Sequence, residues 1–167
     1  MDRTILVNWN GKDISIEKGT ALQKIASDFS NPASPMIVAA KVDNRIKELT
    51  FQLEKDCKVT PVDLTSMDGE RIYLRSLVFV FIRACREVFP DSIVSVEHSF
   101  GGGLYCEVHG KFALTPRQVN RIEQQMRKIV EADESFIKKV VSKEQADTLY
   151  KEMRFPDKSE ILKYRPE

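Results

Sequence analysis

The first 65 residues alternate short apolar and polar runs with turn residues, a pattern typical of a small β-rich domain. Residues 4–9 and 12–17 are β-prone runs joined by Asn10-Gly11, the dipeptide that best tolerates the positive φ angles of a two-residue hairpin turn. Residues 20–29 place apolar side chains at helical spacing, with Thr20 as the expected cap. Further β segments are predicted over residues 36–42, 45–49 and 57–64. This order predicts a β-grasp sheet wrapped over one helix.

Beyond residue 65 the apolar spacing changes to that of helices separated by a strand pair. Residues 70–89 carry a broad apolar surface and end at Pro90, which predicts a long helix covered on most sides. Residues 93–98 and 104–108 predict antiparallel strands around three glycines. Two capping boxes, one at Thr115 to Gln118 and one at Ser142 to Gln145, predict helices over residues 116–132 and 143–153. A β-prone run at residues 136–141 lies between them.

Composition narrows the class of protein. Hydrophobic residues make up 42% and charged residues 31% of the 167 residues, which favours a packed core over a disordered chain. The formal net charge of +1 provides no field that would attract nucleic acid or an anionic membrane to the molecule as a whole. No apolar run approaches the ~20 residues that span a bilayer, and the first residues lead directly into a strand pattern. We therefore expect a cytoplasmic protein without a membrane partner.

The residues that could carry chemistry are few. His98, Cys106 and His109 are the one cluster of metal-ligand side chains, but a pleat would point Cys106 and His109 to opposite faces, so we predict no metal site. The three cysteines are odd in number and lack CxxC spacing. The glycines at 101–103 lack the lysine and hydroxyl of a P-loop. No local catalytic signature is present, and we predict no catalytic residue in this segment.

A basic group on the predicted helix over residues 116–132 is the candidate for RNA contact. Its members are interspersed with glutamates, so a solvated helix face is the alternative interpretation. Phosphate binding would require these cations to be clustered and unpaired. The candidate RNA-binding residues are Arg117, Arg121, Arg127 and Lys128.

With these elements placed, residues 1–66 resemble a TGS domain, the ubiquitin-like β-grasp module of threonyl-tRNA synthetases and some GTPases. The Asn-Gly hairpin, the helix after Gly19-Thr20 and the Lys41-Val42-Asp43-Asn44 turn carry this resemblance. Residues 67–167 are similar to the second domain of threonyl-tRNA synthetase, which edits mischarged tRNA. The Val88-Phe89-Pro90 helix end and the Lys139-Val140-Val141-Ser142 run carry that resemblance. The expected fold is α+β, with the second domain truncated.

The chain departs from the editing domain on its long helix. The editing domain carries an HxxxH pair there, and the corresponding positions aligned from Pro90 are Phe79 and Arg83. Neither side chain replaces a neutral imidazole as base or ligand. Arg83 is either a salt-bridged surface residue or an anion contact in a repurposed cleft.

The run from Asp68 to Leu77, with Glu97-His98-Ser99 and the strand entry at Gly103, looks closest to the N-terminal region of bacterial uridine kinase-like nucleoside kinases. That resemblance implies an accessory, non-catalytic region of a longer nucleoside kinase. It further implies a downstream kinase domain as partner, ATP and magnesium used by the parent kinase, no cofactor in this segment, and tRNA or a small molecule as ligand. The candidate ligand-binding residues are Arg75, Arg83 and His98. The alternative is a divergent threonyl-tRNA synthetase fragment that edits tRNA with His98, Cys106 or His109.

Overall fold

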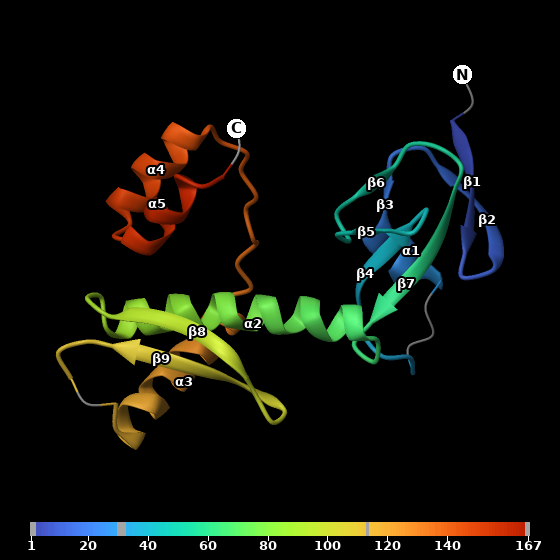
Figure 1. The fold of residues 1–167 in the computed structure, drawn as a ribbon. Helices are drawn as coiled ribbons and strands as arrows, with labels where there is room; N and C mark the ends of the chain where they lie inside the picture. Colours follow the sequence, from blue (N-terminus) through green and yellow to red (C-terminus); the bar gives the residue numbers. More distant parts are fainter. Residues whose placement is uncertain (1–2, 30–32, 113, 166–167) are drawn as a thin grey trace. The chain divides into compact units, whose positions relative to one another are not determined.

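The computed structural model describes residues 3–29, 33–112 and 114–165. They form an α+β protein of two compact units, Met1–Ala132 and Asp133–Glu167 (Figure 1). The expected α+β class is confirmed. The domain boundary predicted between residues 66 and 67 falls inside the first unit, where the longest helix begins, and it stays a prediction.

The first unit begins with a five-stranded β-grasp sheet. Its strand order is β2-β1-β7-β4-β5, with β1 and β7 parallel in the middle. Helix α1 (Leu22–Phe29) packs on this sheet, and Val7, Leu22 and Val59 are fully buried between them. The predicted hairpin turn is confirmed by φ angles of 49° at Asn10 and 90° at Gly11. The strands are β1 (Thr4–Trp9), β2 (Lys12–Glu17), β4 (Ile37–Val42), β5 (Arg45–Lys47) and β7 (Cys57–Asp63).

The start of α1 differs from the prediction. Thr20 does not cap the helix but belongs to β3 (Thr20–Ala21), which pairs with β6 (Gln52–Leu53). The first amides of α1 instead donate to backbone carbonyls of the facing segment, at 3.0 Å from Leu22 N to Phe51 O and 2.8 Å from Gln23 N to Leu49 O. A distant segment therefore satisfies donors that a side-chain cap would otherwise satisfy.

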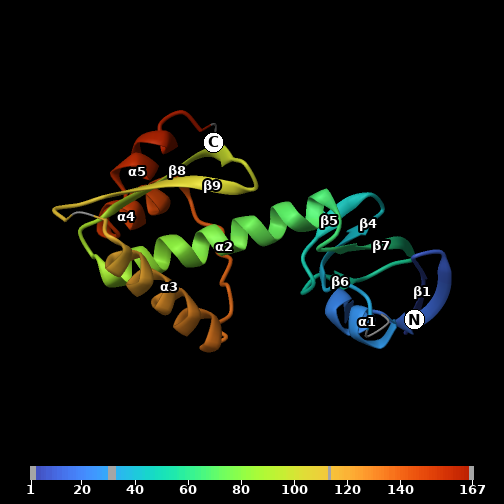
Figure 2. The ribbon, with the colours of Figure 1, turned by 90° about the horizontal axis from the view of Figure 1, so that it is seen from below.

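The rest of the first unit is built on α2 (Met67–Val88). The strands β8 (Ile93–Phe100) and β9 (Gly103–His109) form an antiparallel hairpin beside the C-terminal half of α2, and α3 (Pro116–Glu131) packs against the same helix (Figures 1 and 2). Ala84, Cys85 and Ile122 are buried where these elements meet. The predicted α3 start is confirmed, and the side chain of Gln118 accepts a hydrogen bond from Thr115 N at 3.2 Å.

The prediction that α2 is covered on most sides is wrong for the residues that the structure describes. Tyr73, Leu77 and Phe79 are exposed, and the buried α2 residues are Gly69, Ala84 and Cys85. The apolar content of the helix predicted burial but did not identify a partner for each face.

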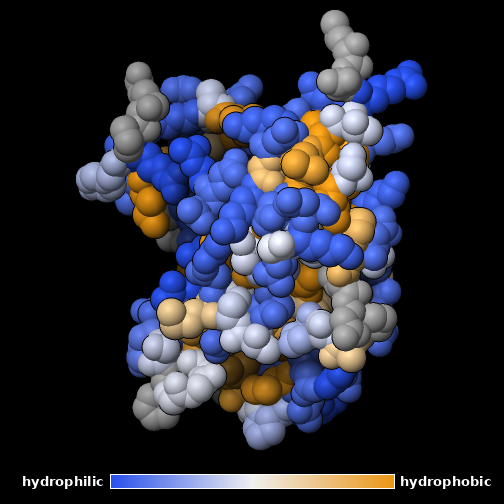
Figure 3. Space-filling model, turned by 90° about the vertical axis from the view of Figure 1, so that its right-hand side faces the viewer, coloured by the Kyte–Doolittle hydropathy of each residue, from blue (hydrophilic) through white to orange (hydrophobic). Residues whose placement is uncertain are grey.

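The surface agrees with the mixed charge of the chain. On the face drawn in Figure 3, hydrophilic side chains cover most of the area and apolar side chains gather in separate places. Among the described residues, none of the helices combines the length and the apolar character needed to span a membrane.

The second unit contains α4 (Lys143–Glu152) and the unpredicted helix α5 (Pro156–Leu162). Ser142 caps α4 as predicted, accepting from Gln145 N at 3.2 Å, while the side chain of Gln145 accepts from Ser142 N at 3.1 Å. The strand predicted over residues 136–141 is wrong. This run forms neither helix nor strand, and Val140 is 95% exposed.

Candidate functional site

The two α2 positions that the resemblance assigns to editing histidines lie on the exposed side of the helix. Phe79 is 68% exposed, and Arg83 is also exposed. Arg83 Nε donates to Glu87 Oε1 at 2.7 Å, one turn further along α2. The guanidinium of Arg83 therefore neutralises a carboxylate on its own helix.

The three predicted ligand-binding residues do not form one compact site on α2. Arg75 lies exposed two turns before Arg83, which is about 12 Å along the helix axis. His98 lies on β8, where its ring stacks on Tyr105 of β9 at a centroid distance of 5.1 Å. The hydroxyl of Tyr105 donates a hydrogen bond to Glu107, and this bond raises the pKa of Tyr105. The three residues remain predictions as ligand contacts.

The other histidine is also engaged on the hairpin. His109 Nε2 lies 2.8 Å from Glu107 Oε2. Cys106 is half-buried while His109 is exposed, consistent with opposite faces of β9. Within the described ranges, no three side chains of the metal-binding types converge on one point.

The structure separates the four predicted RNA-binding residues of α3. Arg127 donates to Glu123 at 2.7 Å, so its charge is paired on the helix surface. Arg117, Arg121 and Lys128 follow a spacing of four and seven residues, which places them on one helix face together with Gln124. Across the part of the chain that the structure describes, no carboxylate forms an ion pair with these three cations.

A polar cleft of about 270 Å³ lies between the C-terminal half of α2 and the exposed face of α3. The sequence carries no signal for this cleft, because Glu87 and Gln125 are 38 residues apart and meet only in the fold. Gln125 Nε2 donates to Glu87 Oε2 at 2.6 Å. The residues that line the cleft are Glu87, Val88, Arg121, Gln124, Gln125 and Lys128.

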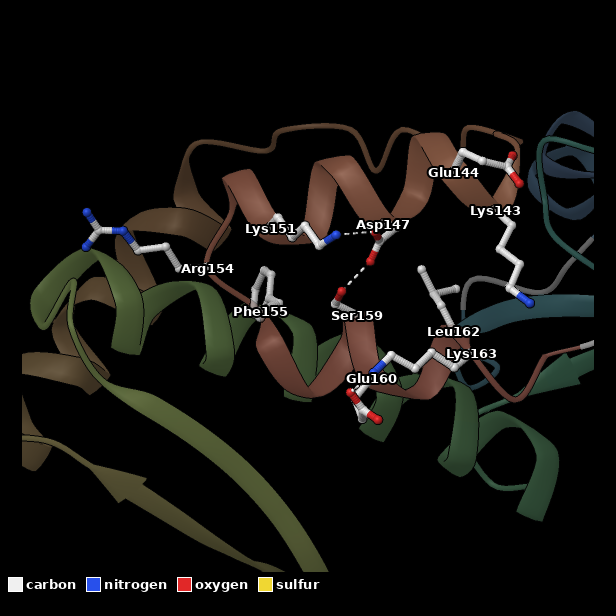
Figure 4. A pocket seen from close by; sticks show the side chains of 10 residues that line it. All are labelled: Lys143, Glu144, Asp147, Lys151, Arg154, Phe155, Ser159, Glu160, Leu162 and Lys163. Atoms are coloured by element: carbon white, nitrogen blue, oxygen red, sulfur yellow. Dashed lines mark hydrogen bonds and ion pairs between the residues drawn. The ribbon is translucent and has the colours of Figure 1, made fainter.

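A second hollow, of about 690 Å³, lies between α4 and α5 in the second unit (Figure 4). Its cations are largely engaged within the unit. Lys151 pairs with Asp147 at 2.6 Å, Lys163 pairs with Glu160 at 2.6 Å, and Ser159 also donates to Asp147. Hydrogen bonds from Lys151 and Ser159 lower the pKa of Asp147. Lys151 and Lys163 are therefore paired with carboxylates, which lowers the positive charge that this hollow could offer an anion.

Comparison with known proteins finds threonine–tRNA ligases among the relatives. No protein-family model matches the chain. It is 28% identical to the threonine–tRNA ligase of Clostridium kluyveri over 158 residues, which are 95% of this chain and 25% of that protein. Identity is 26% over 153 residues with the threonine–tRNA ligase of Nitrosococcus oceani, covering 92% of this chain and 24% of that protein. Identity is 29% over 143 residues with the threonine–tRNA ligase of Anaplasma marginale, covering 86% of this chain and 22% of that protein.

These relatives support the synthetase resemblance, whereas nothing among them supports the nucleoside kinase, which stays an untested prediction. The chain spans about a quarter of the length of the curated relatives it matches. Along nearly its whole length, the chain is thus similar to a segment of threonine–tRNA ligases.

Proposed function

We propose that this chain is a non-catalytic, tRNA-binding accessory segment of a longer protein related to threonyl-tRNA synthetase. Two findings support the class of ligand. The relatives are threonine–tRNA ligases, whose name gives tRNA as the molecule they act on. The similarity covers both the β-grasp sheet and the elements that follow it. Since the chain spans about a quarter of those relatives, the proposal concerns an appended segment rather than a ligase core.

The observation that carries the proposal is the basic face of α3. Arg117, Arg121 and Lys128 are exposed on one side of the helix, while Arg127 is paired with Glu123. Aligned cations without carboxylate partners are what phosphate binding requires. Because the net charge of the chain is only +1, binding must come from this local face rather than from the field of the whole molecule.

The non-catalytic part of the proposal rests on side chains of α2 and of the β8–β9 hairpin. Phe79 has no titratable group, and Arg83 remains protonated and donates to Glu87. His98 and His109 are each in contact with another hairpin residue, Tyr105 and Glu107 respectively. No pair of neutral imidazoles one helical turn apart is therefore available on α2 to activate water for ester hydrolysis.

Binding of tRNA by the purified chain, measured at increasing salt, tests the proposal. Three phosphate contacts should give a slope of log K against log salt of about −2 to −3. Replacing Arg117, Arg121 and Lys128 together with alanine should remove most of this slope, whereas Arg127→Ala should keep it. Absent or salt-insensitive binding would reject the proposal.

A deacylation assay with Ser-tRNA tests the non-catalytic part separately. We expect no hydrolysis above the rate without protein. Hydrolysis that is abolished by His98→Ala or His109→Ala would establish the alternative, a divergent editing fragment.

The reading frame beyond Glu167 tests the identity of the longer protein. A P-loop, with its ATP and magnesium chemistry, would favour a nucleoside kinase. A synthetase core would favour a ligase.

A further inference from the structure

The cleft between α2 and α3 contains an arginine that lies over an aromatic ring. The guanidinium carbon of Arg121 lies 5.3 Å from the ring centroid of Phe89. Phe89 in turn stacks on Phe112, with ring centroids 4.1 Å apart and an interplanar angle of 20°. A guanidinium that lies over a ring face can still direct its N–H donors to an anion. This contact reduces the side-chain freedom that Arg121 would lose on binding an oxyanion.

The same cleft contains one carboxylate, Glu87, which would repel an anion if left uncompensated. Both of its oxygens accept hydrogen bonds, Oε1 from Arg83 at 2.7 Å and Oε2 from Gln125 at 2.6 Å. Arg83 supplies a positive charge beside it, so the pair adds no net charge to the cleft. The cations that themselves line the cleft are Arg121 and Lys128, which belong to the basic face of α3.

We propose that this cleft is a phosphate-binding site, with Arg121 and Lys128 as the anion contacts and Arg83 as a positioning residue that neutralises Glu87. Gln124, which also lines the cleft, supplies an additional amide donor. The inference rests on the proposed function where the phosphate belongs to tRNA. The same chemistry would accept the phosphate of a small phosphorylated molecule, so the ligand class is a phosphate ester or phosphodiester.

The cavity size fits this assignment. About 270 Å³ is below the usual range of roughly 300–1,000 Å³ for sites that enclose a drug-sized ligand. It can hold a phosphate group with its ordered water, while the rest of a ligand would lie outside along α3. Arg117, on the same face one turn before Arg121, would then contact a neighbouring phosphate of a strand.

The test uses the full chain with two ligands, tRNA and inorganic phosphate. Arg121→Ala and Lys128→Ala should each weaken tRNA binding roughly tenfold or more, as expected for a lost charged hydrogen bond. Each should also reduce the salt slope by about 0.7–0.9. Arg127→Ala is the matched control and should change neither value. Arg121→Lys retains the charge and much of the packing, and it should weaken binding less than Arg121→Ala.

The role of Arg83 is tested by a rescue. Arg83→Ala should weaken binding because the positive charge beside Glu87 is lost from the edge of the cleft, and adding Glu87→Gln should restore binding by removing the negative charge as well. A purely structural contribution of Arg83 would not be restored by that second change, so a double variant that binds as poorly as Arg83→Ala would overturn this role.

The outcomes separate the site from the proposed function. tRNA binding that is insensitive to Arg121→Ala and Lys128→Ala would reject the cleft but leave the proposed function standing. Phosphate binding without tRNA binding, lost in the same variants, would support the cleft with a small-molecule ligand and reject the proposed function. If neither ligand binds, both proposals fail.

Discussion

Replacement of Gly69 with alanine tests how the β-grasp sheet is joined to α2. A Cβ at this position would lie 1.8 Å from the carbonyl oxygen of Asp63 and 2.6 Å from its carbonyl carbon. The φ angle of Gly69 is not in the left-handed region, so glycine is required here for space rather than for backbone freedom. The carbonyl of Asp63 also accepts from Ser66 N at 3.2 Å and Ser66 Oγ at 2.7 Å.

We expect Gly69→Ala to destabilise the protein, whereas glycine to alanine in an ordinary helix stabilises it. Glycine to alanine within a helix normally stabilises it by about 1 kcal/mol. Here the clash must move backbone, which costs roughly 1–3 kcal/mol. That movement also disturbs two hydrogen bonds of Asp63, each worth about 1 kcal/mol. We therefore expect Gly69→Ala to lower the free energy of unfolding by about 2–4 kcal/mol.

Urea unfolding followed by the fluorescence of Trp9 measures this change. Trp9 is the one tryptophan of the chain and is buried in the core of the β-grasp sheet. Gly102→Ala is the matched control, because a Cβ there meets no atom within 4 Å, and its effect should stay within about 0.5 kcal/mol. A Gly69→Ala protein as stable as the wild type would refute the reasoning and would indicate that the α2 start yields without cost.

Two further predictions concern titratable groups. The hydrogen bond and charge of Lys41, 2.7 Å from Asp68, lower the pKa of that carboxyl. The Lys41–Asp68 pair should therefore stabilise the fold at neutral pH, and this contribution should be lost as the pH falls through the lowered pKa of Asp68. The unfolding midpoints of wild type and Lys41→Met should differ at pH 6 and converge as the pH falls below about 4. Burial, and secondarily Cys106, raise the pKa of Cys85 to about 11. At pH 8 iodoacetamide should accordingly label the partly exposed Cys57 well before Cys85, as mass spectrometry of the native chain would report; equal labelling rates would contradict the buried position.

The parts of the fold that sequence reasoning predicted are those with local signals. The Asn10-Gly11 turn and the capping boxes at Thr115 and Ser142 involve residues within four positions of one another, and all three begin or join elements where expected. The pairing of Thr20 with Leu53 was missed because two-residue strands leave no period to detect. Residues 136–141 have strand propensity, but a strand also needs a partner for its backbone hydrogen bonds.

The candidate site shows the same limit. All four cations of α3 are visible in the sequence, but it could not tell that Arg127 pairs with Glu123 while Arg121 lies over Phe89. Both facts depend on side-chain geometry, and the second depends on how the C-terminal end of α2, capped by Phe89, packs near α3. The role of Glu87 at the cleft could not be predicted, because in the sequence Glu87 is one of several charged residues near the end of α2. Only the folded structure shows that Gln125 donates a hydrogen bond to it.

Arg83 links the departure from the editing motif to the proposed binding role. The sequence left two interpretations for Arg83, a salt bridge or an anion contact, and its bond to Glu87 favours the first. The anion contacts that we propose are instead Arg121 and Lys128, which line the cleft. A histidine has an unperturbed pKa near 6.5, so at this position it would supply less positive charge beside Glu87 at neutral pH than an arginine does. An arginine stays charged throughout that range. An arginine in place of the imidazole of the editing motif thus provides no base on α2 and, under the proposed binding role, favours a phosphate in the neighbouring cleft.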